Sequence, residues 1–164
     1  SLSKTYSVTG WRLGTVLAPS ELSAAIRKVH DFLTVGAAAP LQRAGAAAMA
    51  LPGEYYLKLA QEYEIRRQTM LDILDECGIP YYKPHGAYYI FCDISKFGFE
   101  NDVRFTEFLV KDVGVAVVPG SSFFRPGDRG NNFIRFCFAK KHETLMAARE
   151  RLLKLPEKLA TRSK

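Results

Sequence analysis

Apolar residues spaced three and four positions apart predict helices at several places in the chain. The first predicted helix begins at Ser20, whose hydroxyl can cap a helix end. Its apolar stripe consists of Leu22, Ile26, Val29 and Leu33. Such a stripe covers one face of a helix, so this helix is expected to pack against another element.

A longer helical pattern runs over residues 54–77 and stops at Gly78, a residue type common just after helix ends. Two shorter helices are predicted, one over residues 101–113 and one starting at His142. Residues 36–53 are mostly small, and they are expected to form a loop and a short helix.

Runs of β-branched and aromatic residues predict strands between these helices. One run is WRLGTVLA at residues 11–18. The others lie after Pro80: GAYYIFCD from Gly86, VAVVP from Val115 and NFIRFCFA from Asn132. The chain is therefore expected to have an α/β fold.

The order of these elements predicts two parts. Residues 51–164, including the long interdomain helix, are expected to form a small C-terminal α+β domain. Residues 1–50 offer too few elements for a core and are expected to be the C-terminal remnant of a larger domain. On this view Trp11, Leu13 and residues 16–17 need a packing partner, and the polar tail from Leu159 is expected to fray.

The composition narrows the classes of function. The net charge is +6, but no block of Lys and Arg is longer than a pair and aromatics do not alternate with cations, so nucleic acid is not an expected partner. Cys77, Cys92 and Cys137 are widely spaced without a nearby His pair, so we expect reduced thiols and no metal site. No signal peptide or membrane-spanning run is evident, and a cytoplasmic location is expected.

Chemically useful residues are densest in SLSKTYSVTGWRLG, residues 1–14. Ser1 and Ser3 are short hydroxyl donors beside Lys4, and Arg12 follows between two glycines. Hydroxyls, a guanidinium and glycines suit a phosphate, while a lysine amine suits an aldehyde cofactor with which it can form an imine. Each residue alone is weak evidence, because single lysines and arginines are mostly solvated surface residues, but their combination is specific.

The segment matches SxSKxxxxxGxRxG at every defined position, and the chain resembles the fold-type I, class I and II aminotransferases that depend on pyridoxal 5'-phosphate. The resemblance implies the C-terminal portion of that fold. It also implies that Lys4 binds the cofactor covalently and acts as general acid and base. Ser1 and Arg12 would bind the phosphate, and the Ser3 hydroxyl would support them without binding the phosphate itself.

A second candidate, Arg135, lies in the segment NFIRFCFA. Strand alternation places Ile134, Phe136 and Phe138 on one face and Arg135 on the other, with no acidic residue in the segment. The pattern alone equally allows an arginine exposed on an edge strand. The resemblance implies instead that Arg135 binds the substrate α-carboxylate through a bidentate pair.

Other polar and aromatic residues are weaker candidates. His30 and His142 are expected on helix surfaces, and His85 in a turn before a strand. One or both of the tyrosines at 88–89 should reach the core, and the resemblance leaves either of them a minor chance of substrate contact. The loop at residues 119–123 is expected to give structural support.

The resemblance implies an enzyme that transfers an amino group between an L-amino acid and a 2-oxo acid, close to kynurenine, aromatic and aspartate transaminases. Family members are more than twice as long and typically homodimeric, so this chain is expected to be a fragment, inactive alone. A carbon-sulfur lyase or an aminocyclopropane-carboxylate-synthase-like enzyme is an alternative that keeps the cofactor. The non-enzymatic alternative is a folded small domain without activity of its own.

Overall fold

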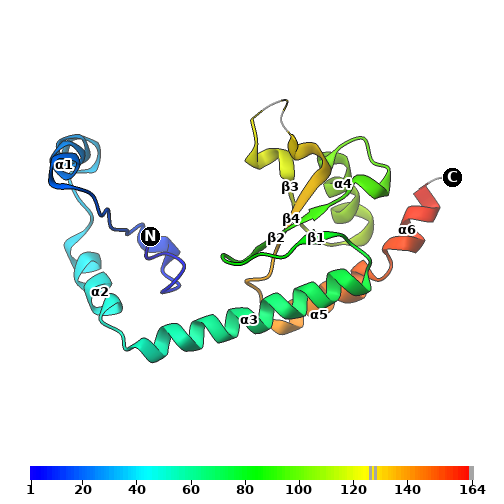
Figure 1. The fold of residues 1–164 in the computed structure, drawn as a ribbon, viewed down its shortest axis with the longest axis horizontal. Helices are drawn as coiled ribbons and strands as arrows, with labels where there is room; N and C mark the ends of the chain where they lie inside the picture. Colours follow the sequence, from blue (N-terminus) through cyan, green and yellow to red (C-terminus); the bar gives the residue numbers. More distant parts are fainter. Residues whose placement is uncertain (126, 128, 163–164) are drawn as a thin grey trace. The chain divides into compact units, whose positions relative to one another are not determined.

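The polypeptide folds into two units, Ser1–Leu59 and Ala60–Lys164, each with its own internal packing. The computed structural model describes residues 1–125, 127 and 129–162. Helix α3, Gly53–Glu76, begins in the first unit and continues into the second (Figure 1). No helix formed by the described residues combines the length and the apolar composition that crossing a bilayer requires.

The first unit is built from helices and an irregular N-terminal segment. A short 3-10 helix, Thr9–Trp11, is followed by α1, Ser20–Thr34, and α2, Ala39–Met49 (Figure 1). The helix predicted from Ser20 and the short helix around Pro40 are confirmed, Pro40 lying in the first turn of α2. The predicted cap by Ser20 is wrong, because Ser20 is already helical and Pro19 precedes α1 without a side-chain cap. The strand predicted at residues 11–18 is wrong, because residues 12–19 pair with no strand among the described residues and take no regular structure.

A glycine in α2 allows the N-terminal segment to pack closely on that helix. A Cβ added to Gly45 would lie 2.6 Å from Leu13 Cδ2 and 3.0 Å from Leu2 Cδ1. Leu2 and Leu13 are each only 8% exposed. The expectation that Leu13 lacks a packing partner is therefore wrong, whereas Val16 and Leu17 are exposed.

The second unit contains one antiparallel sheet of four short strands, in the order β1-β2-β4-β3. The strands are β1, Tyr81–Tyr82; β2, Tyr89–Asp93; β3, Val118–Pro119; and β4, Phe133–Cys137. The three predicted strands are confirmed in shortened form, and β1 is an addition that the sequence did not predict. In β4 the predicted alternation of side chains between the two faces is also confirmed, because buried and half-buried residues alternate along the strand.

One face of the sheet is covered by helices. Ile90 pairs with Phe136 and Cys92 with Ile134, and all four side chains are almost completely buried. The helices that bury them are the second half of α3 together with α4, Asp102–Phe108, α5, His142–Leu152, and α6, Leu155–Arg162. Removing this apolar surface from water is the main stabilising contribution to the unit.

The helix ends follow the predicted signals in most places. Helix α3 ends before Gly78, which has a φ of +63° and whose neighbour Ile79 donates its amide to the Leu74 carbonyl. Asn101 caps α4 by accepting from the Arg104 amide, and the helical path continues to Val113 as a π-helix. The tail expected to fray from Leu159 is helical to residue 162, and residues 163–164 lie outside the described residues.

A buried carboxylate anchors the loop after β3. Asp102 is 1% exposed, and its Oδ2 accepts a hydrogen bond of 2.7 Å from the Ser121 amide. Gly120 is pressed against β4, because an added Cβ would lie 2.6 Å from the Phe133 carbonyl oxygen and 2.5 Å from that of Gly130. The short 3-10 helix Gly120–Phe123 is therefore held in a fixed position, as expected for a supporting loop.

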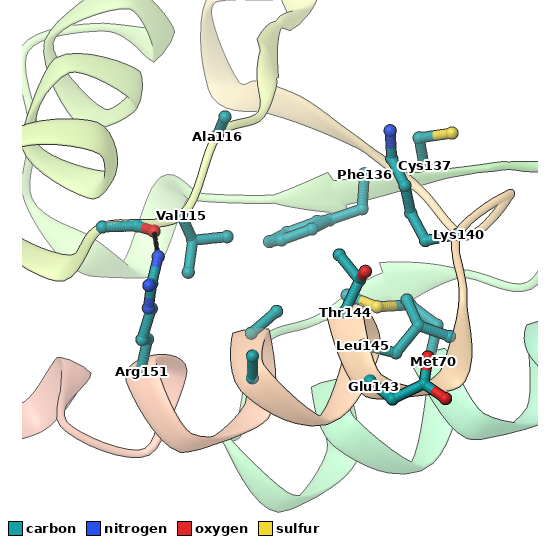
Figure 2. Close-up of a pocket in the computed structure, with 13 residues that line it drawn as sticks. Met70, Val115, Ala116, Phe136, Cys137, Lys140, Glu143, Thr144, Leu145 and Arg151 are labelled. Carbon is teal, nitrogen blue, oxygen red and sulfur yellow. Dashed lines mark hydrogen bonds between the residues drawn. The ribbon is translucent and has the colours of Figure 1, made fainter.

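A cavity of about 560 Å³ opens in the second unit between α5 and the segment that leads to β3 (Figure 2). Its lining is mainly apolar and includes Val115, Phe136 and Leu145. At one end the Arg151 guanidinium donates to the Gly114 carbonyl at 2.6 Å. None of the residues predicted to form the functional site lines this cavity.

The exposed apolar stripe of α1 predicts that the 164-residue chain self-associates. Leu22, Ile26, Val29 and Leu33 are between 42% and 75% exposed, although they lie on one face of an amphipathic helix. Light scattering should give a mass above that of one chain. Replacing both Ile26 and Val29 with Glu should lower this mass, whereas Lys28→Glu on the opposite face should not; a strictly monomeric wild-type chain would contradict the prediction.

The close approach at Gly120 predicts that Gly120→Ala destabilises the second unit. The new methyl group would meet backbone oxygens that cannot move independently, so we expect a loss of about 1–3 kcal/mol in the free energy of unfolding. Urea unfolding followed by circular dichroism measures it. Gly86→Ala is the matched control, because a Cβ there meets nothing within 4 Å, and equal losses for both variants would refute the explanation.

Candidate active site

Residues 1–14 fold back into a closed loop that carries the predicted phosphate and cofactor residues. The Leu2 amide donates to the Leu13 carbonyl at 3.2 Å, which brings Ser1 beside Gly14. A Cβ on Gly14 would lie 3.5 Å from Ser1 Cα, an ordinary contact distance. Inside the loop the Val8 amide donates to the Ser3 carbonyl at 3.0 Å. Positions far apart in the motif thus become neighbours.

Hydrogen bonds connect three of the four predicted residues through Thr9. The Ser1 hydroxyl donates to the Ser3 hydroxyl at 2.9 Å, and the Thr9 hydroxyl donates to the Ser3 carbonyl at 3.2 Å. The Arg12 guanidinium then donates to the Thr9 carbonyl at 3.3 Å. Lys4 lies in the turn within this loop, and its amine makes no hydrogen bond to the described residues.

The donors of this loop fit an anionic group such as a phosphate. Arg12 has a φ of +53°, in the left-handed region that non-glycine residues seldom occupy, and its side chain is exposed with most of its donors free. A backbone held in such a conformation is a feature of functional sites. A pocket of about 490 Å³, lined by Arg12 and Gly14 among others, opens beside it. The residues present therefore suit the phosphate of the cofactor that the motif implies.

Three tyrosines lie around the turn that bears Lys4, and no sequence pattern predicts their association. The Tyr55 hydroxyl donates to the Thr5 carbonyl at 2.6 Å. The hydroxyls of Tyr6 and Tyr56 share a hydrogen bond of 2.7 Å. Tyr55 and Tyr56 belong to the first turns of α3, some fifty positions along the chain, and only the folded structure brings them to the motif.

Arg135 lies in the second unit, on the sheet face opposite the helices. Its strand β4 is paired on both sides, so the edge-strand interpretation is wrong. The guanidinium carbon is 3.7 Å from the Tyr89 ring centroid and 4.2 Å from that of Phe123. Within the described part of the chain this side chain has no hydrogen-bond or ion-pair partner, and its Nε is buried.

The aromatic contacts orient Arg135 but leave its charge without a counterion among the described residues. A hydrogen bond with Tyr88 is the largest cause that raises the pKa of Tyr89 above its ordinary value; burial adds to the rise, and the charge of Arg135 opposes it. Tyr89 therefore remains neutral near pH 7 and contributes its ring face by a cation–π contact. A guanidinium that contacts two aromatic rings and has no counterion among the described residues can still form hydrogen bonds with a carboxylate.

The remaining candidates have ordinary surroundings. His30, His85 and His142 are exposed, and His30 shares a 2.9 Å hydrogen bond with the Thr34 hydroxyl. Tyr88 packs against the core, as expected for one of the two adjacent tyrosines. The three cysteines are free thiols; Cys92 is buried, which raises its pKa, and the other two are half-buried. No group of His, Cys, Asp and Glu side chains within the described ranges could hold a metal ion.

Comparison with known proteins agrees with the motif. The family described as "Aminotransferase class I and II" matches residues 1–152. A methionine aminotransferase of Escherichia coli (strain K12) is 39% identical over 155 residues, which are 94% of this chain and 40% of that protein. Kynurenine–oxoglutarate transaminase 1 of Rattus norvegicus is 33% identical, over 96% of this chain and 42% of its own length. The chain thus spans about 40% of the length of these curated relatives.

Solved structures of aminotransferases also match this chain. The N-succinyldiaminopimelate aminotransferase of Mycobacterium tuberculosis superimposes with a TM-score of 0.88 at 32% sequence identity, over 94% of this chain and 40% of that one. The expected fold class, part of the α/β fold of these pyridoxal-phosphate-dependent enzymes, is confirmed. The family match over residues 1–152 and this superposition together identify the family of the chain. The chain belongs to the class I and II aminotransferases.

Proposed function

We propose that this chain forms part of a pyridoxal-phosphate-dependent aminotransferase, which transfers an amino group between an L-amino acid and a 2-oxo acid. The observation that carries the proposal is the closed loop of residues 1–14. It joins hydroxyl donors, a guanidinium and a free lysine in one hydrogen-bonded turn, within a chain that belongs to the aminotransferase family.

Each residue of the loop has a separate task in this proposal. Pyridoxal phosphate supplies an aldehyde for the amino group and a ring that accepts electrons from the substrate α-carbon. The Lys4 amine would hold the cofactor and would serve as the group that moves the proton at that carbon. Ser1 and Arg12 bind the phosphate through hydroxyl and guanidinium donors, and Ser3 fixes Ser1 by its 2.9 Å hydrogen bond.

Arg135 is proposed to bind the α-carboxylate of the substrate. The rings of Tyr89 and Phe123 hold the guanidinium in one orientation, and a carboxylate would supply the charge partner that the described residues do not. The planar guanidinium of arginine forms two parallel hydrogen bonds with a carboxylate. Amino acids can make this pair and simple amines cannot, so the site would favour amino acids.

We propose further that residues 1–50 are part of the large cofactor-binding domain and that residues 51–164 form the small domain. The relatives are about two and a half times as long as the matched segment, which supports a role within a larger enzyme. Lys4 and Arg12 are exposed in this chain, so water would weaken their electrostatic effect on a bound group, and we propose that the chain alone is inactive. The enzyme is proposed to be a homodimer in the cytoplasm, where its free thiols remain reduced.

Replacing Lys4 with Ala in the full-length enzyme should abolish both turnover and the visible absorption band of the lysine-bound cofactor. No other group in the loop can form that bond, so the loss should be complete in absorption and several orders of magnitude in rate. Lys111→Ala, which removes an exposed lysine from the second unit, should retain both properties. A Lys4→Ala enzyme with its absorption band intact would assign the cofactor to another lysine.

Replacing Arg135 with Ala should raise KM for amino acids far more than for the corresponding amines. The lost bidentate pair should cost about 2–5 kcal/mol of binding free energy, which only carboxylate-bearing substrates experience. Arg135→Lys should recover little of it, because an ammonium neither stacks between the two rings nor forms the fork. Arg104→Ala, which removes a 62%-exposed arginine, serves as control, and equal effects on acids and amines would remove the proposed role.

A further inference from the structure

The tyrosines near Lys4 form a compact group that we name the tyrosine clasp: Tyr6, Tyr55 and Tyr56. The rings of Tyr6 and Tyr55 stack with centroids 5.9 Å apart, and Tyr56 meets each of them edge-on at 6.3 and 5.4 Å. All three side chains are half-buried. Aromatic pairs in these arrangements stabilise one another beyond the area that they bury.

Two hydrogen bonds from α3 hold the lysine turn, one to a backbone carbonyl of the turn and one to a side-chain hydroxyl. Tyr55 donates to the carbonyl of Thr5, the residue that follows Lys4, at 2.6 Å. Tyr56 meets the hydroxyl of Tyr6, two positions after Lys4, at 2.7 Å. Of the backbone hydrogen bonds within the same turn, Val8 to Ser3 is 3.0 Å, whereas Tyr6 to Leu2 and Ser7 to Lys4 are both stretched to 3.3 Å. The bonds from α3 therefore add a restraint where two of the turn's own bonds are long.

The Tyr6 hydroxyl remains neutral near pH 7 because its pKa is raised. The hydrogen bond with Tyr56 is the largest cause that raises the pKa of Tyr6 to about 12, and burial adds to it. Tyr6 therefore does not exchange protons with the lysine near pH 7. Its hydroxyl stays available for the bond to Tyr56, so Tyr6 contributes to the restraint of the turn.

We infer that Tyr55 and Tyr56 are positioning residues for Lys4, which hold its turn through the Thr5 carbonyl and the Tyr6 hydroxyl. This inference rests on the proposed function of Lys4 as the cofactor lysine. A lysine that must both hold a cofactor and move a proton works only within narrow limits of position, so the backbone that carries it has to be fixed. The first turn of α3 supplies that fixation.

Hydrogen exchange of the cofactor-free, full-length protein tests the restraint without any reference to catalysis. Tyr55→Phe keeps the ring but removes the donor to Thr5, and exchange of the amides of residues 6–8 should become roughly five-fold faster, the effect of one lost hydrogen bond. Tyr6→Phe should act similarly by removing the second bond. Tyr63→Phe, lower on the same helix, is the matched control: its ring packs on Tyr88, and its hydroxyl has no hydrogen bond to the described residues.

A spectroscopic titration then tests the consequence for Lys4. In Tyr55→Phe the pH midpoint of the absorption change of the lysine-bound cofactor should rise, because a less restrained turn lets the protonated nitrogen of that bond reach water more easily. Tyr63→Phe should retain the wild-type midpoint. Unchanged exchange and midpoint in Tyr55→Phe, or equal changes in Tyr63→Phe, would overturn the inference. A wild-type enzyme without a lysine-bound absorption band would instead refute the proposed function, whatever the exchange result.

Discussion

The packing of α3 is the constraint on which both units depend. Its second half buries Met70, Leu71, Ile73 and Leu74 almost completely against the sheet and the other helices of the second unit. Its first turns belong to the first unit and carry Tyr55 and Tyr56. Within the first unit, the lysine turn takes its restraint from these first turns of α3 through the hydrogen bonds of Tyr55 and Tyr56.

Arg12 in the first unit and Arg135 in the second unit are each oriented before any anion binds, but by different contacts. Arg12 is placed by its left-handed backbone and by the pairing of Leu2 with Leu13, and its guanidinium donates to the Thr9 carbonyl. Arg135 is placed by aromatic rings, one of which, Phe123, belongs to the loop anchored by Asp102. Fixing donors before a ligand arrives lowers the entropic cost of binding, which is how such sites gain both affinity and selectivity.

The sequence predicted those features that depend on short-range patterns. The helix starting at Ser20, the stop at Gly78 and the alternation along β4 each follow from local rules, and all are confirmed. The strand at residues 11–18 failed because strand formation needs a neighbour, and propensity alone does not supply one. The Tyr55–Thr5 bond and the packing of Phe123 on Arg135 join distant positions, which no local pattern reveals.

The most direct test of the central claim, that Lys4 is the cofactor lysine, is chemical trapping. Borohydride reduces the double bond between a lysine and pyridoxal phosphate to a stable amine, and peptide mapping by mass spectrometry then locates the modified residue in the full-length protein. We predict that the cofactor mass is found on Lys4, in the peptide that begins the loop of residues 1–14. Recovery of the label on another lysine, with Lys4 unmodified, would contradict this assignment.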